Sequence, residues 1–122
     1  MSDPILGRFD LDAEMTRLAP GDNAAGRRAE TLIKGDRFRV VLITMRAGAH
    51  LNEHTAPGPI TIQALRGDFV LSVGAEESAL PAGSLVSLAA GIEHAVRAET
   101  DGAFLLTIGW DPEWGGTPGG IA

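Results

Sequence analysis

The chain has 122 residues, of which 44% are hydrophobic and 21% charged, a composition typical of one globular domain. Ten Lys and Arg against 16 Asp and Glu give a net charge of -6. This argues against nucleic-acid binding, which needs a basic surface. With no cysteine, disulfides and thiolate chemistry are excluded. The first residues carry no basic, apolar secretion signal and apolar runs such as 40–43 are too short to cross a membrane, so we expect a cytoplasmic protein without membrane contacts.

The first predicted element is a short helix over residues 10–18. Leu11, Met15 and Leu18 fall on one helical face, and Asp10 or Asp12 could cap the first turn. The Pro-Gly-Asp-Asn sequence at 20–23 then ends the helix. We expect this helix to pack on the outside of the domain.

The rest of the chain has the pattern of β-strands. Strands are predicted at residues 27–34, 37–46, 60–66, 69–73, 84–88, 94–99 and 103–110. The segment between the strands at 37–46 and 60–66, which carries His50 and His54, is predicted to be mostly loop. Turn signals recur about every eight to twelve residues, which is typical of an all-β sandwich or barrel.

The predicted organisation is a single domain in three parts. Residues 1–36 form the helix and a lead-in strand, residues 37–110 form the barrel, and residues 111–122 form a flexible tail rich in Gly and Pro. Open barrels expose strand edges that pairing protects, so we expect a homodimer, with the strand at 27–34 crossing to the partner.

Alternation assigns the inward residues of two strands. Ile60 and Ile62 share one face of their strand, while Thr61 lies on the other. His94 and Val96 share one face of their strand, and the charged residues of that strand lie on its other face. A histidine is therefore expected inside the barrel, among apolar neighbours.

Two segments have the spacing of a known pair of motifs. In the first, Gly48 and Gly67 stand at the two ends and His54 follows Gly48 after five residues. In the second, Gly83, Gly91 and His94 keep the expected register. In this register the chain resembles the cupin family of double-stranded β-helix (jelly-roll) barrels, over roughly residues 37–110.

The resemblance implies a metal site made by three histidines and a glutamate, and here the sequence departs from it. Ala56 stands at the second histidine position and Ile60 at the glutamate position. In the second motif Ala89 replaces a proline and Ala98 an asparagine. Because a divalent ion needs at least three good ligands, His54 and His94 alone would hold one weakly.

Three hypotheses follow for the function. In the first, the barrel binds a small molecule without metal, through a pocket of His54, His94, Ile60, Ile62 and Val96. In the second, His50 completes a site with His54 and His94 for Fe, Mn, Ni or Zn, as in a dioxygenase or isomerase. The third is a ligand-free interaction module. In a metal-free barrel, His54 and His94 could also act as an acid/base pair.

Overall fold

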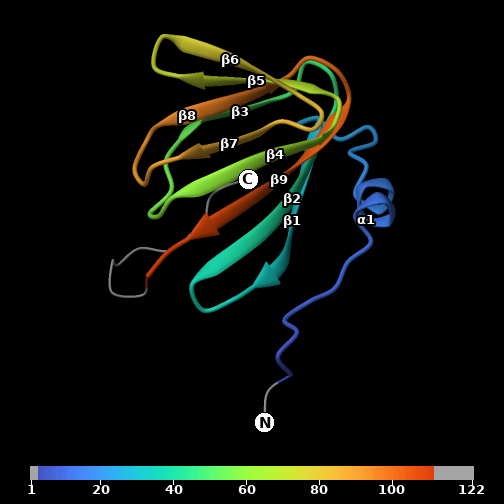
Figure 1. Ribbon diagram of the computed structural model, residues 1–122. Coiled ribbons are helices and arrows are strands. Elements are labelled where there is room, and N and C mark those ends of the chain that lie inside the picture. The colour runs from blue at the N-terminus through green and yellow to red at the C-terminus, as the bar shows by residue number, and fades with distance from the viewer. Residues whose placement is uncertain (1–2, 112–122) are drawn as a thin grey trace.

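The computed structural model describes residues 3–111 and shows two antiparallel β-sheets that enclose one core, with a short helix outside them (Figure 1). The larger sheet has the strand order β1-β2-β9-β4-β7 and the smaller one β3-β8-β5-β6. The elements are α1 (Leu11–Arg17), β1 (Arg27–Lys34), β2 (Phe38–Met45), β3 (His50–His54), β4 (Ile60–Arg66), β5 (Asp68–Val73), β6 (Glu76–Pro81), β7 (Leu85–Leu88), β8 (His94–Ala98) and β9 (Gly102–Gly109). The predicted all-β barrel with a short N-terminal helix is confirmed.

Two strands lie where the sequence predicted turn or loop. β3 occupies the segment around His50, and β6 begins at Glu76 within a predicted turn. Both strands carry many polar residues because much of their surface is exposed, so the apolar alternation of a strand is weak in them. The first of these errors matters for function, because a strand fixes which way each side chain points.

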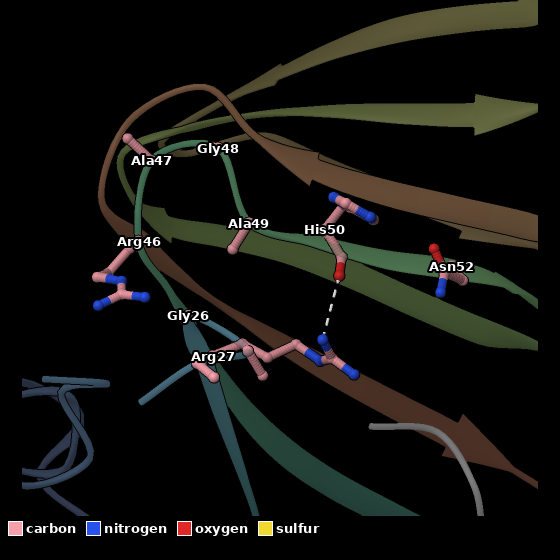
Figure 2. A pocket seen from close by; sticks show the side chains of 10 residues that line it. Gly26, Arg27, Arg46, Ala47, Gly48, Ala49, His50 and Asn52 are labelled. Carbon is pink, nitrogen blue, oxygen red and sulfur yellow. Dashed lines mark hydrogen bonds between the residues drawn. The ribbon is translucent and has the colours of Figure 1, made fainter. Parts of the chain in front are cut away.

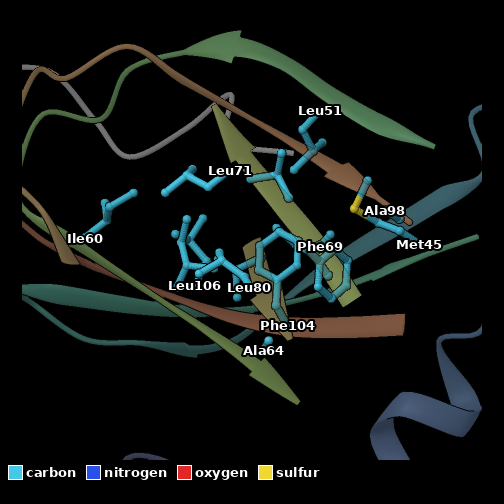
Figure 3. Packing of buried hydrophobic residues seen from close by; sticks show 14 of the residues in the cluster. Met45, Leu51, Ile60, Ala64, Phe69, Leu71, Leu80, Ala98, Phe104 and Leu106 are labelled. Carbon is cyan, nitrogen blue, oxygen red and sulfur yellow. The ribbon is translucent and has the colours of Figure 1, made fainter. Parts of the chain in front are cut away.

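The core lies between the two sheets (Figure 3). Phe69 from the smaller sheet and Phe104 from the larger one meet edge to face, with ring centroids 5.2 Å apart. Apolar residues from both sheets fill the remaining space, among them Ile43, Leu71 and Leu106. Burial of this surface is the main stabilising term of the fold.

Helix α1 packs against the outer face of the larger sheet. Asp10, one of the two residues proposed from the sequence, is its N-cap, and its side chain accepts a hydrogen bond from the backbone N–H of Ala13. Met15 and Leu18 are buried against Leu42 of β2. The hydroxyl of Thr44 donates to the carbonyl oxygen of Leu18 at 2.7 Å, which anchors the end of the helix.

The two ends of the barrel differ, and we name them for what lies there. At the helix end are the connections at 46–49, 82–84 and 99–101, on the side of the barrel where α1 lies (Figure 1). Gly67 turns there with φ +74°, and a Cβ atom on it would lie 2.3 Å from the carbonyl oxygen of Asp101, so only glycine fits.

The opposite end, which we call the histidine end, is where β3 ends and β8 begins. The connections at 35–37, 55–59, 74–75 and 89–93 gather there (Figure 1). β1 belongs to the larger sheet, where it pairs along its length with β2. The division into three parts stays a prediction, and its tail lies outside the described residues except for Asp111.

Candidate functional site

His54 and His94 face each other at the end of the β3–β8 pair. They are directly opposite in the register, and their ring centroids lie 4.4 Å apart with the planes tilted by 54°. A register shift between Leu51 and His54 produces this arrangement: two residues separate them on β3, whereas a single residue separates their partners on β8. The bulge therefore keeps both Leu51 and His54 on the inner face of the sheet.

Both imidazole rings are held in the same tautomer by the backbone. Nδ1 of His54 lies 2.8 Å from the carbonyl oxygen of Asn52, and Nδ1 of His94 lies 3.0 Å from that of Ile92. Because a carbonyl oxygen can only accept, each Nδ1 is the donor and carries the proton. In the neutral rings each Nε2 keeps its lone pair, and neither Nε2 has a hydrogen-bond partner among residues 3–111.

His94 is the more enclosed of the two rings, at 3% exposure, while His54 is half-buried. Burial lowers the pKa of His94, and the neighbouring His54 lowers it further, although the hydrogen bond to Ile92 opposes this. The His94 ring is therefore neutral at physiological pH. Its Nε2 is a hydrogen-bond acceptor there.

His50 does not join this pair. It is opposite Arg97 in the register and lies on the outer face of the sheet, where it is exposed. Its backbone carbonyl accepts a hydrogen bond from Arg27 at 3.3 Å, and it lines a separate surface pocket of about 470 Å³ (Figure 2). The predicted set of His50, His54 and His94 is thus not brought together, because His50 lies on a strand and not on an adaptable loop.

The donor set at the histidine end does not fit a resident transition metal. Ala56 and Ile60, at the positions where the motif has a histidine and a glutamate, are buried at 6% and 3% exposure within the apolar core. Within residues 3–111, no cluster of three His, Cys, Asp or Glu side chains could hold a metal ion. Two imidazoles without a carboxylate leave such an ion short of ligands.

The apolar residues of the predicted pocket lie on the inner faces of the sheets. Ile60 and Ile62 come from β4 and Val96 from β8, and all three are at most 3% exposed. Ile60 begins its strand at the histidine end, whereas Ile62 and Val96 lie deeper.

Arg39 is a residue of this end that the sequence reasoning missed. It pairs with Ile108 in the β2–β9 register, and Ile108 is a fully buried core residue, so both side chains lie on the inner face. The Arg39 guanidinium carbon sits 5.4 Å from the centroid of the Trp110 ring. Its Nε is buried and has no hydrogen-bond partner within residues 3–111. Alternation along β2 could have revealed it, since Arg39 has the same parity as inward Val41 and Ile43.

Two exposed glutamates precede the two histidines in sequence: Glu53 on β3, and Glu93 in the connection that leads into β8. The pKa of Glu53 is raised, chiefly by its hydrogen bond to Glu93 and then by repulsion between the two carboxylates. This side of the histidine end is therefore acidic. Arg39 places a positive charge on the inner face of the other sheet at this end.

Comparison with known proteins supports the fold. No protein-family model matches the sequence, and comparison with curated proteins gives no significant match. Solved structures do match. A cupin superfamily protein from Desulfitobacterium hafniense DCB-2 is 19% identical with a TM-score of 0.67, covering 70% of this chain and 78% of that one. An RmlC-like cupin protein from Desulfovibrio desulfuricans is 24% identical with a TM-score of 0.64, covering 89% and 95%.

An enzyme is among the similar structures. A mutant of salicylate 1,2-dioxygenase from Pseudoaminobacter salicylatoxidans is 18% identical with a TM-score of 0.69, covering 81% of this chain and 32% of that one. Identities of this size establish the architecture and leave the activity open. The chain has the cupin fold, as its two motifs predicted. None of the helices in the described part of the chain has the length and apolarity to span a membrane.

Proposed function

We propose that this protein binds a small organic molecule at the histidine end of its barrel, through His54 and His94. The observation that carries the proposal is the shared orientation of the two rings. Each Nδ1 is held by a backbone carbonyl, so each Nε2 lone pair is left for a ligand. Two acceptors with 4.4 Å between ring centroids suit a molecule that carries a hydroxyl or N–H donor.

The surroundings favour a ligand with an apolar body. Ile60 and Ile108 pair with each other on the inner face of the larger sheet at this end, and both are buried. Ligand sites are commonly apolar with a few placed polar groups, and the histidines supply such groups here. The site therefore combines contact area with polar contacts that fix the orientation of the ligand.

This proposal is preferred to a metal-dependent enzyme that uses His50, His54 and His94. The two hypotheses differ in the metal content of untagged protein, which elemental mass spectrometry measures after gel filtration without chelator. We expect far less than one equivalent of Fe, Mn, Ni or Zn, because two imidazoles form an incomplete ligand set. Close to one equivalent of a single metal, lost in His54→Ala, would instead favour the metal site.

The binding proposal is tested with probe molecules and the three histidines as reporters. Phenol, benzamide, indole and benzoate share an apolar body and differ in their polar group. Each is titrated while the Hε1 resonances of His50, His54 and His94 are followed by NMR. We expect binding probes to move the signals of His54 and His94 and to leave that of His50 unchanged, because His50 lies on the outer face.

Two variants make the test specific. His54→Ala should weaken every probe that binds, whereas His50→Ala is the matched control and should bind as the parent chain does. If no probe moves the His54 and His94 signals, or if His54→Ala leaves binding unchanged, the proposal is wrong. A rise in melting temperature with a probe gives an independent measure, since a ligand that prefers the native state must stabilise it.

We also propose that the chain forms a homodimer. β1 is an edge strand of the larger sheet, and unpaired edges favour association. Beside it, the N-terminal segment exposes Ile5, Leu6 and Phe9 at 51%, 63% and 40%. A second copy that covers both features would bury this apolar surface. Light scattering coupled to gel filtration tests this: the mass of a dimer is expected, and a single monomer mass would contradict it.

A further inference from the structure

We propose that the molecule bound at the histidine end is a small organic carboxylate and that Arg39 binds its carboxylate group. This inference rests on the proposed function, because it names the chemical class of ligand for the same site. It is carried by a different observation, the position of a cation on the inner face of an apolar barrel.

Register and burial place Arg39 inside the histidine end. It is directly opposite Ile108, which in turn is opposite Ile60 on β4. These three residues form one row across the larger sheet, and two of them are core residues. β4 begins at Ile60, where the connection from His54 enters, and so this row lies at the same end as the histidine pair.

Arg39 is half-buried, and its guanidinium lacks a polar partner among the described residues. Among residues 3–111 it forms no ion pair with a carboxylate, and its contact there is the face of the Trp110 ring. Its Nε is buried without an acceptor. Buried donors such as this Nε are nearly always paired. A ligand carboxylate would satisfy this requirement, since the guanidinium fork matches its two oxygens.

The charges around Arg39 define the orientation of such a ligand. Lys34 lies opposite Arg39 in the β1–β2 register, but its side chain is exposed, so Arg39 is the cation of the inner face here. Across the barrel, Glu53 and Glu93 make the β3–β8 side acidic. A carboxylate is thus attracted toward Arg39, while a hydroxyl or N–H of the same molecule faces the Nε2 atoms of the histidines.

A carboxylate fits this site better than a phosphate. The inner face offers one guanidinium and apolar neighbours such as Ile60 and Ile108. Phosphates are usually held by several backbone N–H groups or by more than one cation, because they carry more charge. One guanidinium beside an apolar surface matches a single negative charge on an apolar body.

The test compares benzoate with benzamide, which has nearly the same shape and no charge. Affinities are measured by isothermal titration calorimetry, and the Nε resonance of Arg39 is followed by NMR. Arg39→Gln removes the cation, Arg39→Lys keeps the charge without the fork, and Arg28→Gln is a control. Arg28 also lies on the β1–β2 pair, but near the helix end and on the outer face with Thr44, so it removes an equal charge away from the site.

We expect benzoate to bind more tightly than benzamide and to move the Arg39 Nε signal. Arg39→Gln should weaken benzoate roughly ten- to hundredfold, the range for loss of charge-assisted hydrogen bonds. Arg39→Lys should weaken it less, and Arg28→Gln should leave it unchanged. The His54 and His94 resonances report that each variant is folded.

Three results would overturn the inference. They are equal binding of benzoate and benzamide, unchanged benzoate affinity in Arg39→Gln, and equal weakening by Arg28→Gln. If benzamide or phenol moves the histidine signals while benzoate does not, the inference is wrong and the proposed function stands. If none of the probes moves them, the proposed function fails as well.

Discussion

The two ends of the barrel differ in how their polar groups are paired. At the helix end, several of these groups bind one another across different segments of the chain. The side chain of Asp101 accepts a hydrogen bond from the backbone N–H of Ala47 at 2.8 Å. The hydroxyl of Thr100 accepts one from the N–H of Asp68 at 3.0 Å. Arg66 donates to Asp12 at 2.9 Å. These hydrogen bonds stabilise the helix end of the barrel.

At the histidine end, polar atoms remain without partners after folding. Nε of Arg39 and Nε2 of both His54 and His94 have no hydrogen-bond partner among residues 3–111. Of these three atoms, Nε of Arg39 is buried, and a buried donor without a partner needs an explanation. A ligand at this end would supply that partner and use the two Nε2 acceptors as well. Substitutions at the two ends should therefore have different consequences.

The largest effect is expected from Phe104→Ala in the core toward the helix end. Phe104 is 1% exposed and packs edge to face on Phe69, so its loss removes buried apolar surface and leaves a cavity. The free energy of unfolding should fall by about 3–5 kcal/mol. Urea denaturation followed by circular dichroism measures this. A fall of less than about 1 kcal/mol would show that this core is not packed as described.

Thr44→Val should have the next largest effect, because it removes the hydrogen bond that anchors the end of α1 to the sheet. The buried Thr44 hydroxyl donates to the Leu18 carbonyl, and valine leaves that carbonyl without its partner. We expect a loss of about 1–2 kcal/mol in the free energy of unfolding. Thr31→Val is the control: Thr31 is exposed, and its change should stay within about 0.5 kcal/mol. Equal effects of the two substitutions would contradict the role of the helix anchor.

Arg39→Leu should have a smaller effect of the opposite sign. It removes an inward cation whose Nε is unpaired, and loses the contact with the Trp110 ring. We expect the free energy of unfolding to rise by about 0.5–1 kcal/mol. Thermal and urea denaturation test this directly. A clear loss of stability, beyond that of Arg28→Leu, would mean that Arg39 has a structural role in the fold.

The smallest effect concerns pH. Burial lowers the pKa of His94 from its ordinary 6.5, so the unfolded chain binds this proton more readily than the native one. The free energy of unfolding should therefore be higher at about pH 7.5 than at about pH 5.5. His94→Gln should reduce this difference.

Glu53 contributes to the pH dependence of the free energy of unfolding with the opposite sign. Its pKa is raised in the native protein, so the stability that it provides is lost as the pH rises through that pKa. The comparison of His94→Gln with the parent chain isolates the contribution of His94 to the pH dependence of stability. His50→Gln, which changes an exposed residue, is the control and should keep the parent pH dependence. A parent-like pH dependence in His94→Gln would show that His94 is not the group responsible.

The fold could be predicted because its strongest signals are local. Gly48, Gly67, Gly83 and Gly91 all have positive φ, a conformation that favours glycine, and their spacing carried the resemblance. The helix cap at Asp10 and the inward position of His94 followed from short-range rules as well. These features depend on a few neighbouring residues.

The arrangement of the candidate site followed only in part from the sequence, because it depends on pairing between distant segments. His50 was expected near His54, but the β3–β8 register and its bulge place it on the outer face. Nothing in the sequence of residues 50–54 predicts that bulge. Arg39 was overlooked because an arginine near the start of a strand usually faces solvent. Its inward position becomes clear once β2 and β9 are paired.

The most direct test is the tautomer of His54 and His94, measured by long-range ¹H–¹⁵N NMR near neutral pH without any added ligand. The structure requires a protonated Nδ1 and a lone pair on Nε2 in both rings, because each Nδ1 donates to a backbone carbonyl. That pattern in both rings would establish that two acceptors are available to a ligand. A protonated Nε2 with a bare Nδ1 in either ring would contradict the binding site proposed here.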